Sequence, residues 1–204
     1  AEVINAQSPT LIFLTTPNNP TGTVTSLTDI ERIAQICRER NSLLVIDEAY
    51  QEFSSEQSAV TLIDKYPNII VSRTMSKAFA FAGTRLGYLV ANPSVVDALQ
   101  LVRLPYHLST ATQALAIVAL SYSQELLGNV ALLSKERERV RQQLERLGVS
   151  ALQSGANFFL HATATPGELW QKLLAAGVLI RDVGLPGALR VTIGTPEEND
   201  RFIA

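Results

Sequence analysis

The sequence predicts an α/β fold with a mostly parallel sheet, followed by a small α+β domain. Two observations predict it. From residue 10 to about residue 105, short apolar runs typical of buried strands alternate with amphipathic segments typical of helices. After that, a long helical region precedes a run of strand, helix, two strands and a final helix. We therefore expect one domain over residues 1–120 and a second over residues 121–204.

The first half contains the strands of the expected parallel sheet. The segment 26–40 between the first two strands predicts a helix, and Thr28 and Glu31 have the spacing of a capping box. Asn92 followed by Pro93 predicts the start of another helix. The strand-like runs are TLIFLTT (10–16), LLVIDEAY (43–50), NIIVSRTMSK (68–77) and LGYLVANP (86–93).

The second half is first helical, with a possible break near Ser121. Its charged stretch SKERERVRQQLERLG is most simply a solvated helix face. Thr165 and Glu168 have capping-box spacing for one later helix, which Gly177 would end, and Thr195 and Glu198 open the last helix. The expected strands here are NFFLHAT (157–163), VLIRDV (178–183) and LRVTIG (189–194).

Composition narrows the function classes. The chain has 204 residues, 47% hydrophobic, and a net charge of -2 from 17 basic and 19 acidic residues. This composition argues against disorder and suggests neither a nucleic-acid partner nor a membrane partner. The single cysteine, Cys37, excludes an internal disulfide and fits a reducing cytoplasm. We find no apolar run near the roughly 20 residues of a membrane span and no signal segment at the start of the chain.

Polar side chains gather where three of the predicted strands end. They lie in the stretches Asn18–Gly22, Asp47–Tyr50 and Ser72–Lys77, and Arg85 follows shortly after. Ligands of open α/β sheets bind beyond the carboxyl ends of the parallel strands. We therefore expect these groups to face one ligand.

The residue types at these strand ends point to the chemistry of that ligand. An Asp at the end of a buried strand needs a cationic partner or hydrogen bonds, and a lysine near other cations becomes a nucleophile for carbonyls. The remaining groups suit a phosphate and a single oxygen atom: Thr74, Ser76 and Arg85 for the phosphate, and Asn19 and Tyr50 for the oxygen. A ligand with an aldehyde, a phosphate, a basic ring nitrogen and a phenolate oxygen fits all of them, and pyridoxal 5'-phosphate is such a ligand.

At this point the chain resembles the fold-type I pyridoxal-phosphate aminotransferases, and histidinol-phosphate aminotransferases in particular. The resemblance covers nearly all of the chain and rests on four motifs in order. These are PNNPTG (17–22), VIDEAY (45–50), SRTMSKAFAFAGTRLGY (72–88) and LRVTIGTPEEND (189–200).

The resemblance implies a role for each site residue. Lys77 would be the Schiff-base lysine that also moves the substrate proton, and Asp47 would keep the ring nitrogen protonated. Asn19 and Tyr50 would hold the phenolate oxygen, with a cis bond between Asn19 and Pro20 fixing the turn. Thr74, Ser76 and Arg85 would bind the phosphate. Arg190 would bind the substrate α-carboxylate, and Asn19 would also contact the substrate. No residue is expected to hold a metal.

Taken singly, these residues have plain structural interpretations. Lys77 could be a loop lysine, Asp47 could cap the next helix, and Arg190 could be a surface residue of a strand. We interpret His107, His161 and Cys37 as structural, and a role near the substrate for Arg181 stays open. The four motifs in order favour the functional interpretation.

The expected activity is transamination between histidinol phosphate and 2-oxoglutarate in histidine biosynthesis, by a cytoplasmic homodimer. The resemblance implies that the chain is a C-terminal fragment without roughly the first 150 residues of the family's length. We expect an exposed sheet edge, exposed apolar surface and little activity by itself. The alternatives are an aromatic amino acid aminotransferase, a decarboxylase of phosphorylated amino acids with the same fold, and an inactive structural fragment.

Overall fold

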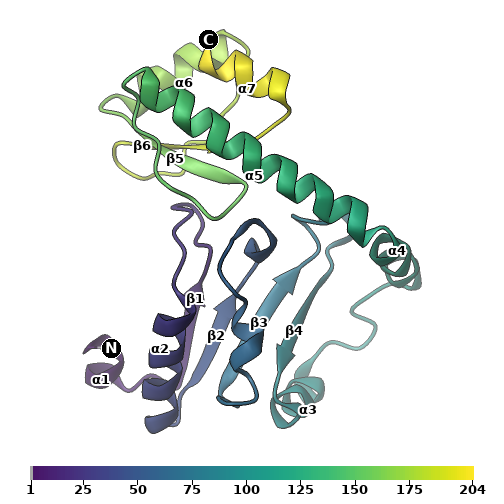
Figure 1. The fold of residues 1–204 in the computed structure, drawn as a ribbon. Helices are drawn as coiled ribbons and strands as arrows, with labels where there is room; N and C mark the ends of the chain where they lie inside the picture. The colour runs from purple at the N-terminus through teal and green to yellow at the C-terminus, as the bar shows by residue number, and fades with distance from the viewer. Residues whose placement is uncertain (1) are drawn as a thin grey trace.

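The computed structural model describes residues 2–204, which form two sheets joined by one long helix (Figure 1). The N-terminal sheet has the order β1-β2-β3-β4. Strands β1, β2 and β3 are parallel, and β4 runs antiparallel to β3. The predicted α/β fold with a mostly parallel sheet is confirmed. The strands are β1 (Leu11–Thr15), β2 (Leu43–Asp47), β3 (Ile69–Thr74) and β4 (Gly87–Ala91).

One face of this sheet is covered by α2 (Leu27–Glu39), whose apolar stripe packs on β2 and β3. The core there includes Ile30, Ala34 and Cys37, which are buried as predicted for Cys37. On the other face, Phe13 of β1 is 72% exposed. The expected exposed apolar surface is therefore present on the side away from α2. The short elements around this sheet are α1 (Glu2–Gln7), η1 (Gln51–Phe53), η2 (Ala59–Leu62) and η3 (Ala82–Thr84).

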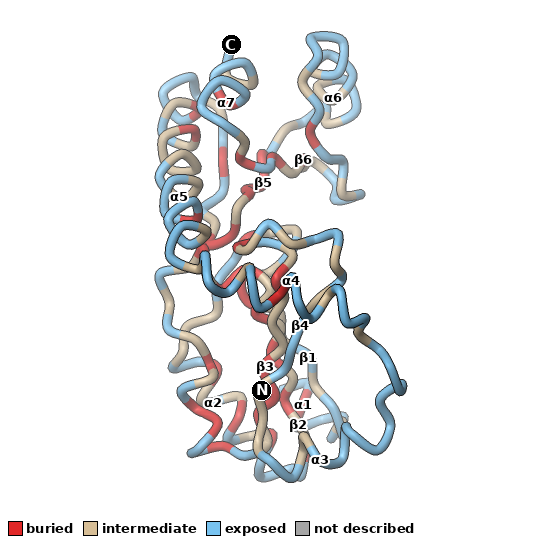
Figure 2. Tube along the Cα trace, turned by 90° about the vertical axis from the view of Figure 1, so that its right-hand side faces the viewer, coloured by how far each residue is buried: buried red, intermediate tan, exposed pale blue. Residues whose placement is uncertain are grey.

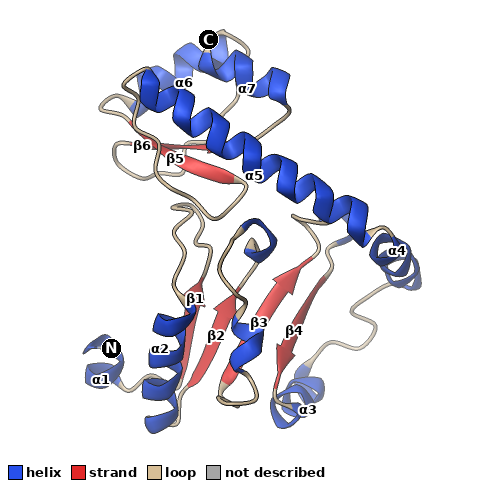
Figure 3. Cartoon of the chain, viewed as in Figure 1, coloured by secondary structure: helices blue, strands red, loops and turns tan. Residues whose placement is uncertain are grey.

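The second sheet is a small antiparallel pair of β5 (Phe158–Ala162) and β6 (Ala188–Thr192). Helices α5 (Ser123–Arg146), α6 (Pro166–Ala175) and α7 (Pro196–Ile203) lie on one side of it (Figure 3). Phe159 and Val191 point into this core. Because side chains alternate along a strand, their neighbours Phe158 and Arg190 face the other way, toward the N-terminal sheet.

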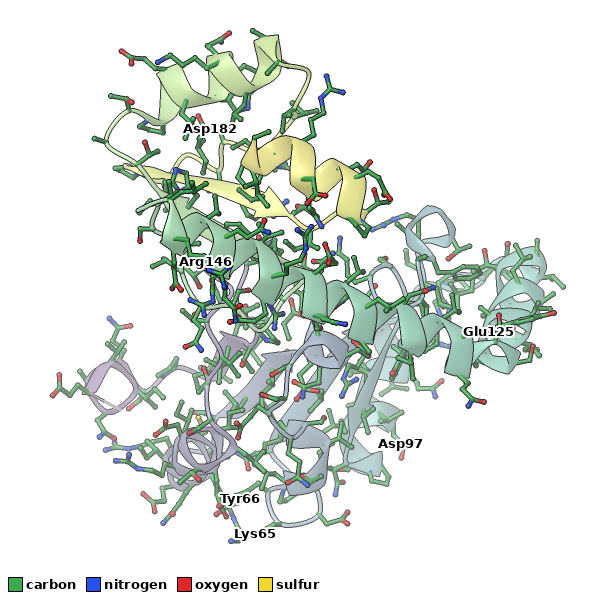
Figure 4. All side chains as sticks on the ribbon, turned by 45° about the horizontal axis from the view of Figure 1, so that its top comes forward. Lys65, Tyr66, Asp97, Glu125, Arg146 and Asp182 are labelled. Carbon is green, nitrogen blue, oxygen red and sulfur yellow. The ribbon has the colours of Figure 1, made fainter. Side chains whose placement is uncertain are left out.

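Two further helices, α3 (Pro93–Val102) and α4 (Thr110–Ser121), connect β4 to α5. The predicted break near Ser121 is confirmed, since α4 ends there and α5 begins at Ser123 with a bend of 71°. In Figure 4, Glu125 and Arg146 mark the two ends of α5. Within residues 2–204, no single helix is long and apolar enough to cross a membrane; α4 and α5 meet that criterion only as a bent pair.

Three local predictions were wrong. The first long helix begins after Ser26, whose side chain accepts the Asp29 N–H, so Thr28 lies inside the helix and forms no capping box with Glu31. Thr165 precedes α6 but its side chain makes no capping hydrogen bond. The segment 178–183 forms only an isolated bridge, Arg181 to Arg190, instead of a strand.

Two other local predictions are confirmed. Thr195 and Glu198 form a reciprocal capping box at the start of α7. The peptide bond between Asn19 and Pro20 is cis, as is the bond between Thr16 and Pro17.

Candidate active site

The carboxyl ends of β1, β2 and β3 point toward the β5–β6 sheet (Figure 1). Thr15 pairs with Asp47 at the end of β1 and β2, and Asp47 pairs with Ser72 of β3. The parallel register therefore brings the polar segments that follow these strands to one edge, as the sequence predicted. One apolar cluster fills the interface between the two sheets, here called the joint, and it includes Tyr50, Ala78 and Phe158.

Asp47 and Tyr50 follow each other at the end of β2. The Asp47 carboxylate accepts one hydrogen bond from the Ala49 N–H at 3.1 Å, which fixes its direction at the strand end. Tyr50 is only 7% exposed. Burial raises the pKa of its phenol, while the positive charge of Arg190 lowers that pKa and the carboxylate of Asp47 raises it. The phenol therefore lies within electrostatic reach of both groups.

Arg190 and Asn19 meet across the joint although they are 171 residues apart in the chain. The Arg190 guanidinium donates a hydrogen bond to Oδ1 of Asn19 at 2.8 Å, and its carbon lies 4.8 Å from the centre of the Phe158 ring. The Phe158 ring in turn packs edge-on against Tyr50 at 5.2 Å between ring centres. These contacts place Arg190, Asn19 and Tyr50 in one site.

The Arg190 guanidinium has unused hydrogen-bonding capacity. Its Nε atom is buried and has no hydrogen-bond partner among residues 2–204. Burial lowers the pKa of Arg190, the phenol of Tyr50 raises it, and the nearby Arg181 lowers it further. A partly buried guanidinium whose Nε–H has no partner among residues 2–204 is suited to an anionic ligand.

Lys77 approaches the same site from β3. Its Nζ lies 5.7 Å from the centre of the Tyr50 ring, and the residue is exposed. The hydroxyls of Thr74 and Ser76 are 2.9 Å apart, and the Ser76 N–H donates to the Thr74 hydroxyl at 3.1 Å. The lysine and this pair of hydroxyls thus come from one short turn.

Within residues 2–204, Arg85 makes no side-chain hydrogen bond or ion pair with the other predicted site residues. Arg85 is exposed, adopts a left-handed backbone conformation with φ 56°, and donates to the Ala82 carbonyl at 3.2 Å. Its predicted role at a phosphate stays a prediction.

Arg181 lies directly beside Arg190. The Arg181 N–H donates to the Arg190 carbonyl at 3.0 Å, and the Arg190 N–H donates to the Arg181 carbonyl at 2.8 Å. Both arginines line a cavity of about 440 Å³ together with Trp170, Asp182 and Thr192. A larger cavity of about 980 Å³ near Ser54 and Arg137 contains none of the predicted site residues.

Sequence analysis missed three residues that shape the site. Phe158 supports both Arg190 and Tyr50; the period-two alternation of its strand puts it opposite the core residue Phe159, but no sequence signal relates it to Tyr50. Glu48 and Arg73 lie in the stretches that were expected to face the ligand, but they pair with each other beneath the strand ends, with Glu48 buried and Arg73 partly buried. Their signal is a charged residue inside or directly after a buried strand.

The donor set fits pyridoxal 5'-phosphate. An amine, a carboxylate at a strand end, a phenol and an amide lie around one joint, and two hydroxyls precede the amine. These are the groups that an aldehyde, a ring nitrogen, a phenolate oxygen and a phosphate require. The cavity of about 440 Å³ that Arg190 lines leaves room for an anionic substrate group beside them.

Comparison with known proteins agrees with this chemistry. The family model of aminotransferase class I and II matches residues 2–204. Histidinol-phosphate aminotransferase of Corynebacterium glutamicum strain R is 56% identical over 204 residues, covering 99% of this chain and 55% of that protein. The chain therefore spans about half the length of the curated relatives it matches.

Solved structures give the same picture. Histidinol-phosphate aminotransferase from Sinorhizobium meliloti, solved in complex with pyridoxal-5'-phosphate, has a TM-score of 0.86 at 28% identity, covering 99% of this chain and 57% of that one. L-threonine-O-3-phosphate decarboxylase from Porphyromonas gingivalis has a TM-score of 0.82 at 27% identity, covering 95% and 62%.

Proposed function

Since the chain belongs to the aminotransferase class I and II family, we propose that its protein transfers an amino group between histidinol phosphate and 2-oxoglutarate with pyridoxal 5'-phosphate as cofactor. The 56% identity to a histidinol-phosphate aminotransferase supports histidinol phosphate as the amino donor. The decarboxylase of the same fold is 27% identical, and no observation favours that reaction or an aromatic substrate.

One observation carries the proposal. The hydrogen bond between Arg190 and Asn19 joins the C-terminal motif, to which we assign the substrate, to the N-terminal motif, to which we assign the cofactor. Tyr50 and Lys77 lie against the same group of side chains. An amine and an anion-binding guanidinium at one site are what transamination of an anionic substrate needs.

Each residue then has a defined task. Lys77 holds the cofactor and moves a proton at the α-carbon of the substrate, while Asp47 keeps the ring nitrogen charged. Tyr50 and Asn19 donate hydrogen bonds to the phenolate oxygen, and Thr74, Ser76 and Arg85 bind the phosphate. When bound, the cofactor supplies an electron-withdrawing ring that makes the substrate α-proton acidic.

Arg190 serves the two substrates in turn. The 2-oxo acid carries a carboxylate and histidinol phosphate carries a phosphate monoester, and a planar guanidinium binds either group through two N–H donors. Arg181 lines the cavity beside Arg190, so we place it near the substrate as a second positive charge.

We further propose that the complete protein is a cytoplasmic homodimer and that the 204-residue chain alone has little activity. The division into domains 1–120 and 121–204 is part of this proposal. The relatives are about twice as long as this chain, which supports the low activity of the chain alone. The buried thiol of Cys37 suits a reducing compartment, which supports the cytoplasm.

Visible absorption spectroscopy tests the proposal. The purified chain is mixed with pyridoxal 5'-phosphate beside the variants Lys77→Ala and Lys65→Ala. We expect a lysine-bound cofactor band in the parent chain and in Lys65→Ala, and borohydride should fix it to Lys77. In the complete protein, histidinol phosphate should then convert the band to that of the amine form of the cofactor. A band that persists in Lys77→Ala would contradict the role of this lysine.

A further inference from the structure

A group of charged side chains lies beneath the strand ends that carry the site, and in it Glu48 is buried while Arg73 and Glu52 are partly buried. Glu48 is 1% exposed, and its Oε2 atom accepts hydrogen bonds from the Arg73 guanidinium at 2.8 Å and from the Ser58 hydroxyl at 2.7 Å. Its Oε1 atom accepts the Ala59 N–H at 2.7 Å. Arg73 also donates to Glu52 at 2.9 Å, so one guanidinium joins two carboxylates.

This group occupies the face of the sheet opposite to the cofactor residues. Asp47 pairs with Ser72 in the parallel register, so these two residues and Thr74 share one face. Because successive side chains alternate, Glu48 and Arg73 point to the other face. The Glu48 N–H donates to the Ser72 carbonyl at 3.0 Å, which extends the ladder by one residue beyond β2. The ion pair therefore ties the ends of β2 and β3 together from below.

A buried ion pair is weak evidence for stability, because the loss of hydration offsets much of the attraction between the charges. What it does provide is fixed geometry, since the planar fork of an arginine binds in one orientation. Here Arg73 comes one residue before Thr74 and four residues before Lys77, and its partner Glu48 directly follows Asp47. The position of the Glu48–Arg73 ion pair is thus coupled to the main-chain positions of Asp47 and Lys77.

We infer that Glu48 and Arg73 are positioning residues that set the separation between Asp47 and Lys77 and so align both with the cofactor. The inference rests on the proposed function. Neither side chain points to the cofactor face, so they act through the backbone of the two strands. Arg73 and Glu48 should therefore affect the reactivity of Lys77 more than they affect folding.

The test measures how selectively Lys77 reacts. The chain is treated with pyridoxal 5'-phosphate, the adduct is fixed with borohydride, and each lysine is quantified by peptide mass spectrometry. The other lysines, Lys65, Lys135 and Lys172, serve as references in the same sample. Lys65 comes before the start of β3, whereas Lys77 follows the end of β3. In Figure 4 Lys65 lies at the opposite end of the molecule from Asp182, which lines the cavity beside Arg190, so Lys65 reports unselective labelling.

We compare Arg73→Met, Arg73→Lys and Glu48→Gln with the parent chain. Supporting groups commonly change the performance of the residues they hold by tenfold or more, so Arg73→Met and Glu48→Gln should lower the selectivity for Lys77 by about tenfold. Arg73→Lys keeps the charge and should recover part of it. Arg139→Met is the matched control, because Arg139 also joins two carboxylates, Glu136 and Asp200, but away from the site. Circular dichroism checks that each variant is folded.

The outcomes separate the inference from the proposed function. If the parent chain labels Lys77 selectively and both folded variants do so equally, the inference is wrong and the proposed function stands. If the parent chain shows no preference for Lys77, the proposed role of this lysine fails and the inference fails with it. If Arg73→Met and Glu48→Gln are both unfolded while Arg139→Met is folded, the pair serves folding alone and the inference is again overturned.

Discussion

Tyr50 is the side chain at which the two parts of the site meet. Its ring contacts Phe158 of the small sheet on one side and lies 5.7 Å from the Lys77 amine on the other. Since burial raises the pKa of its phenol, the hydroxyl keeps its proton at neutral pH and can donate a hydrogen bond. The ring of Tyr50 thus packs in the joint between the two sheets, while its hydroxyl can donate a hydrogen bond to the ligand.

The raised pKa of Tyr50 makes a testable prediction about alkaline pH. The folded chain should contain one tyrosine that ionises above the ordinary value of 10.0, because burial penalises the phenolate. The folded state then holds this proton more tightly than the unfolded state, so stability is lost as pH rises through 10.0 and beyond. Ultraviolet difference titration should show the late-ionising group, and Tyr50→Phe should abolish it. Tyr106→Phe is the control, since Tyr106 is 99% exposed.

At the scale of helices and strands, the apolar segments that form them were predictable from the sequence, whereas the residues that cap or pair their ends through hydrogen bonds were less predictable. The strands of the N-terminal sheet follow from continuous apolar runs, whose burial outweighs local preferences. The extent of α2 was predicted closely, but its cap was not, because Ser26 and Thr28 are both good capping residues and the structure uses Ser26. The segment 178–183 was predicted as a strand from its residue types, but only Arg181 pairs with β6 there.

The loop after β1 is fixed to the segment before β5 by two glycines. The Gly155 N–H donates to the Gly22 carbonyl at 2.8 Å. A Cβ atom on Gly155 would lie 2.3 Å from Cγ2 of Val24, and one on Gly22 would lie 2.1 Å from Oγ of Ser154. This close contact holds the loop that carries Asn19 against the region that carries Arg190.

Gly155→Ala should therefore destabilise the chain by about 1–3 kcal/mol, the usual cost of overpacking. Val24 is 40% exposed, so Val24→Ala alone should change stability by less than about 0.5 kcal/mol. The double variant should recover most of the loss, because the clash partner is gone. Urea unfolding of all four chains gives the coupling free energy. Strictly additive effects would mean that the two positions do not interact.

Helix α5 contains a carboxylate whose charge depends on an arginine of the same helix. Hydrogen bonds from Arg141 hold the pKa of Glu138 down to about 2 from an ordinary 4.5. The lowered pKa means that the native state stabilises the ionised form, so this stability is present above pH 4.5 and is lost as pH falls toward about 2. Glu138→Gln should make the melting temperature less sensitive to pH in this window.

At the scale of the whole molecule, the site is assembled from both ends of the chain. The sequence predicted Asn19, Asp47, Lys77 and Arg190 as one site from ordered motifs, and the structure brings Asn19 and Arg190 into contact. The sequence could not predict that Phe158 would link Tyr50 to Arg190, because these contacts depend on how the small sheet packs against the large one. Arg85 shows the converse: its motif is present, but among residues 2–204 its side chain donates a hydrogen bond only to the Ala82 carbonyl.

The exposed apolar surface predicts how the whole chain behaves in solution. On α4, Leu115, Ile117, Val118 and Leu120 are between 52% and 71% exposed, and Figure 2 shows most of this helix as exposed. Burying such side chains contributes about 25 cal/mol for each Å² of apolar surface, so the 204-residue chain should associate with further copies as its concentration rises. Sedimentation velocity over a range of concentrations measures this association directly.

A substitution on α4 tests whether this helix is responsible for the association. Ile117→Lys replaces a 71% exposed apolar side chain with a charge and should weaken self-association by roughly tenfold, the effect of losing about 1.4 kcal/mol of contact free energy. Gln113→Lys adds the same charge on the same helix at an exposed polar position, so it should leave the association nearly unchanged. If both variants weaken the association equally, net charge and not the apolar face of α4 controls it. A parent chain that stays monomeric at every concentration would show that this exposed surface does not drive association.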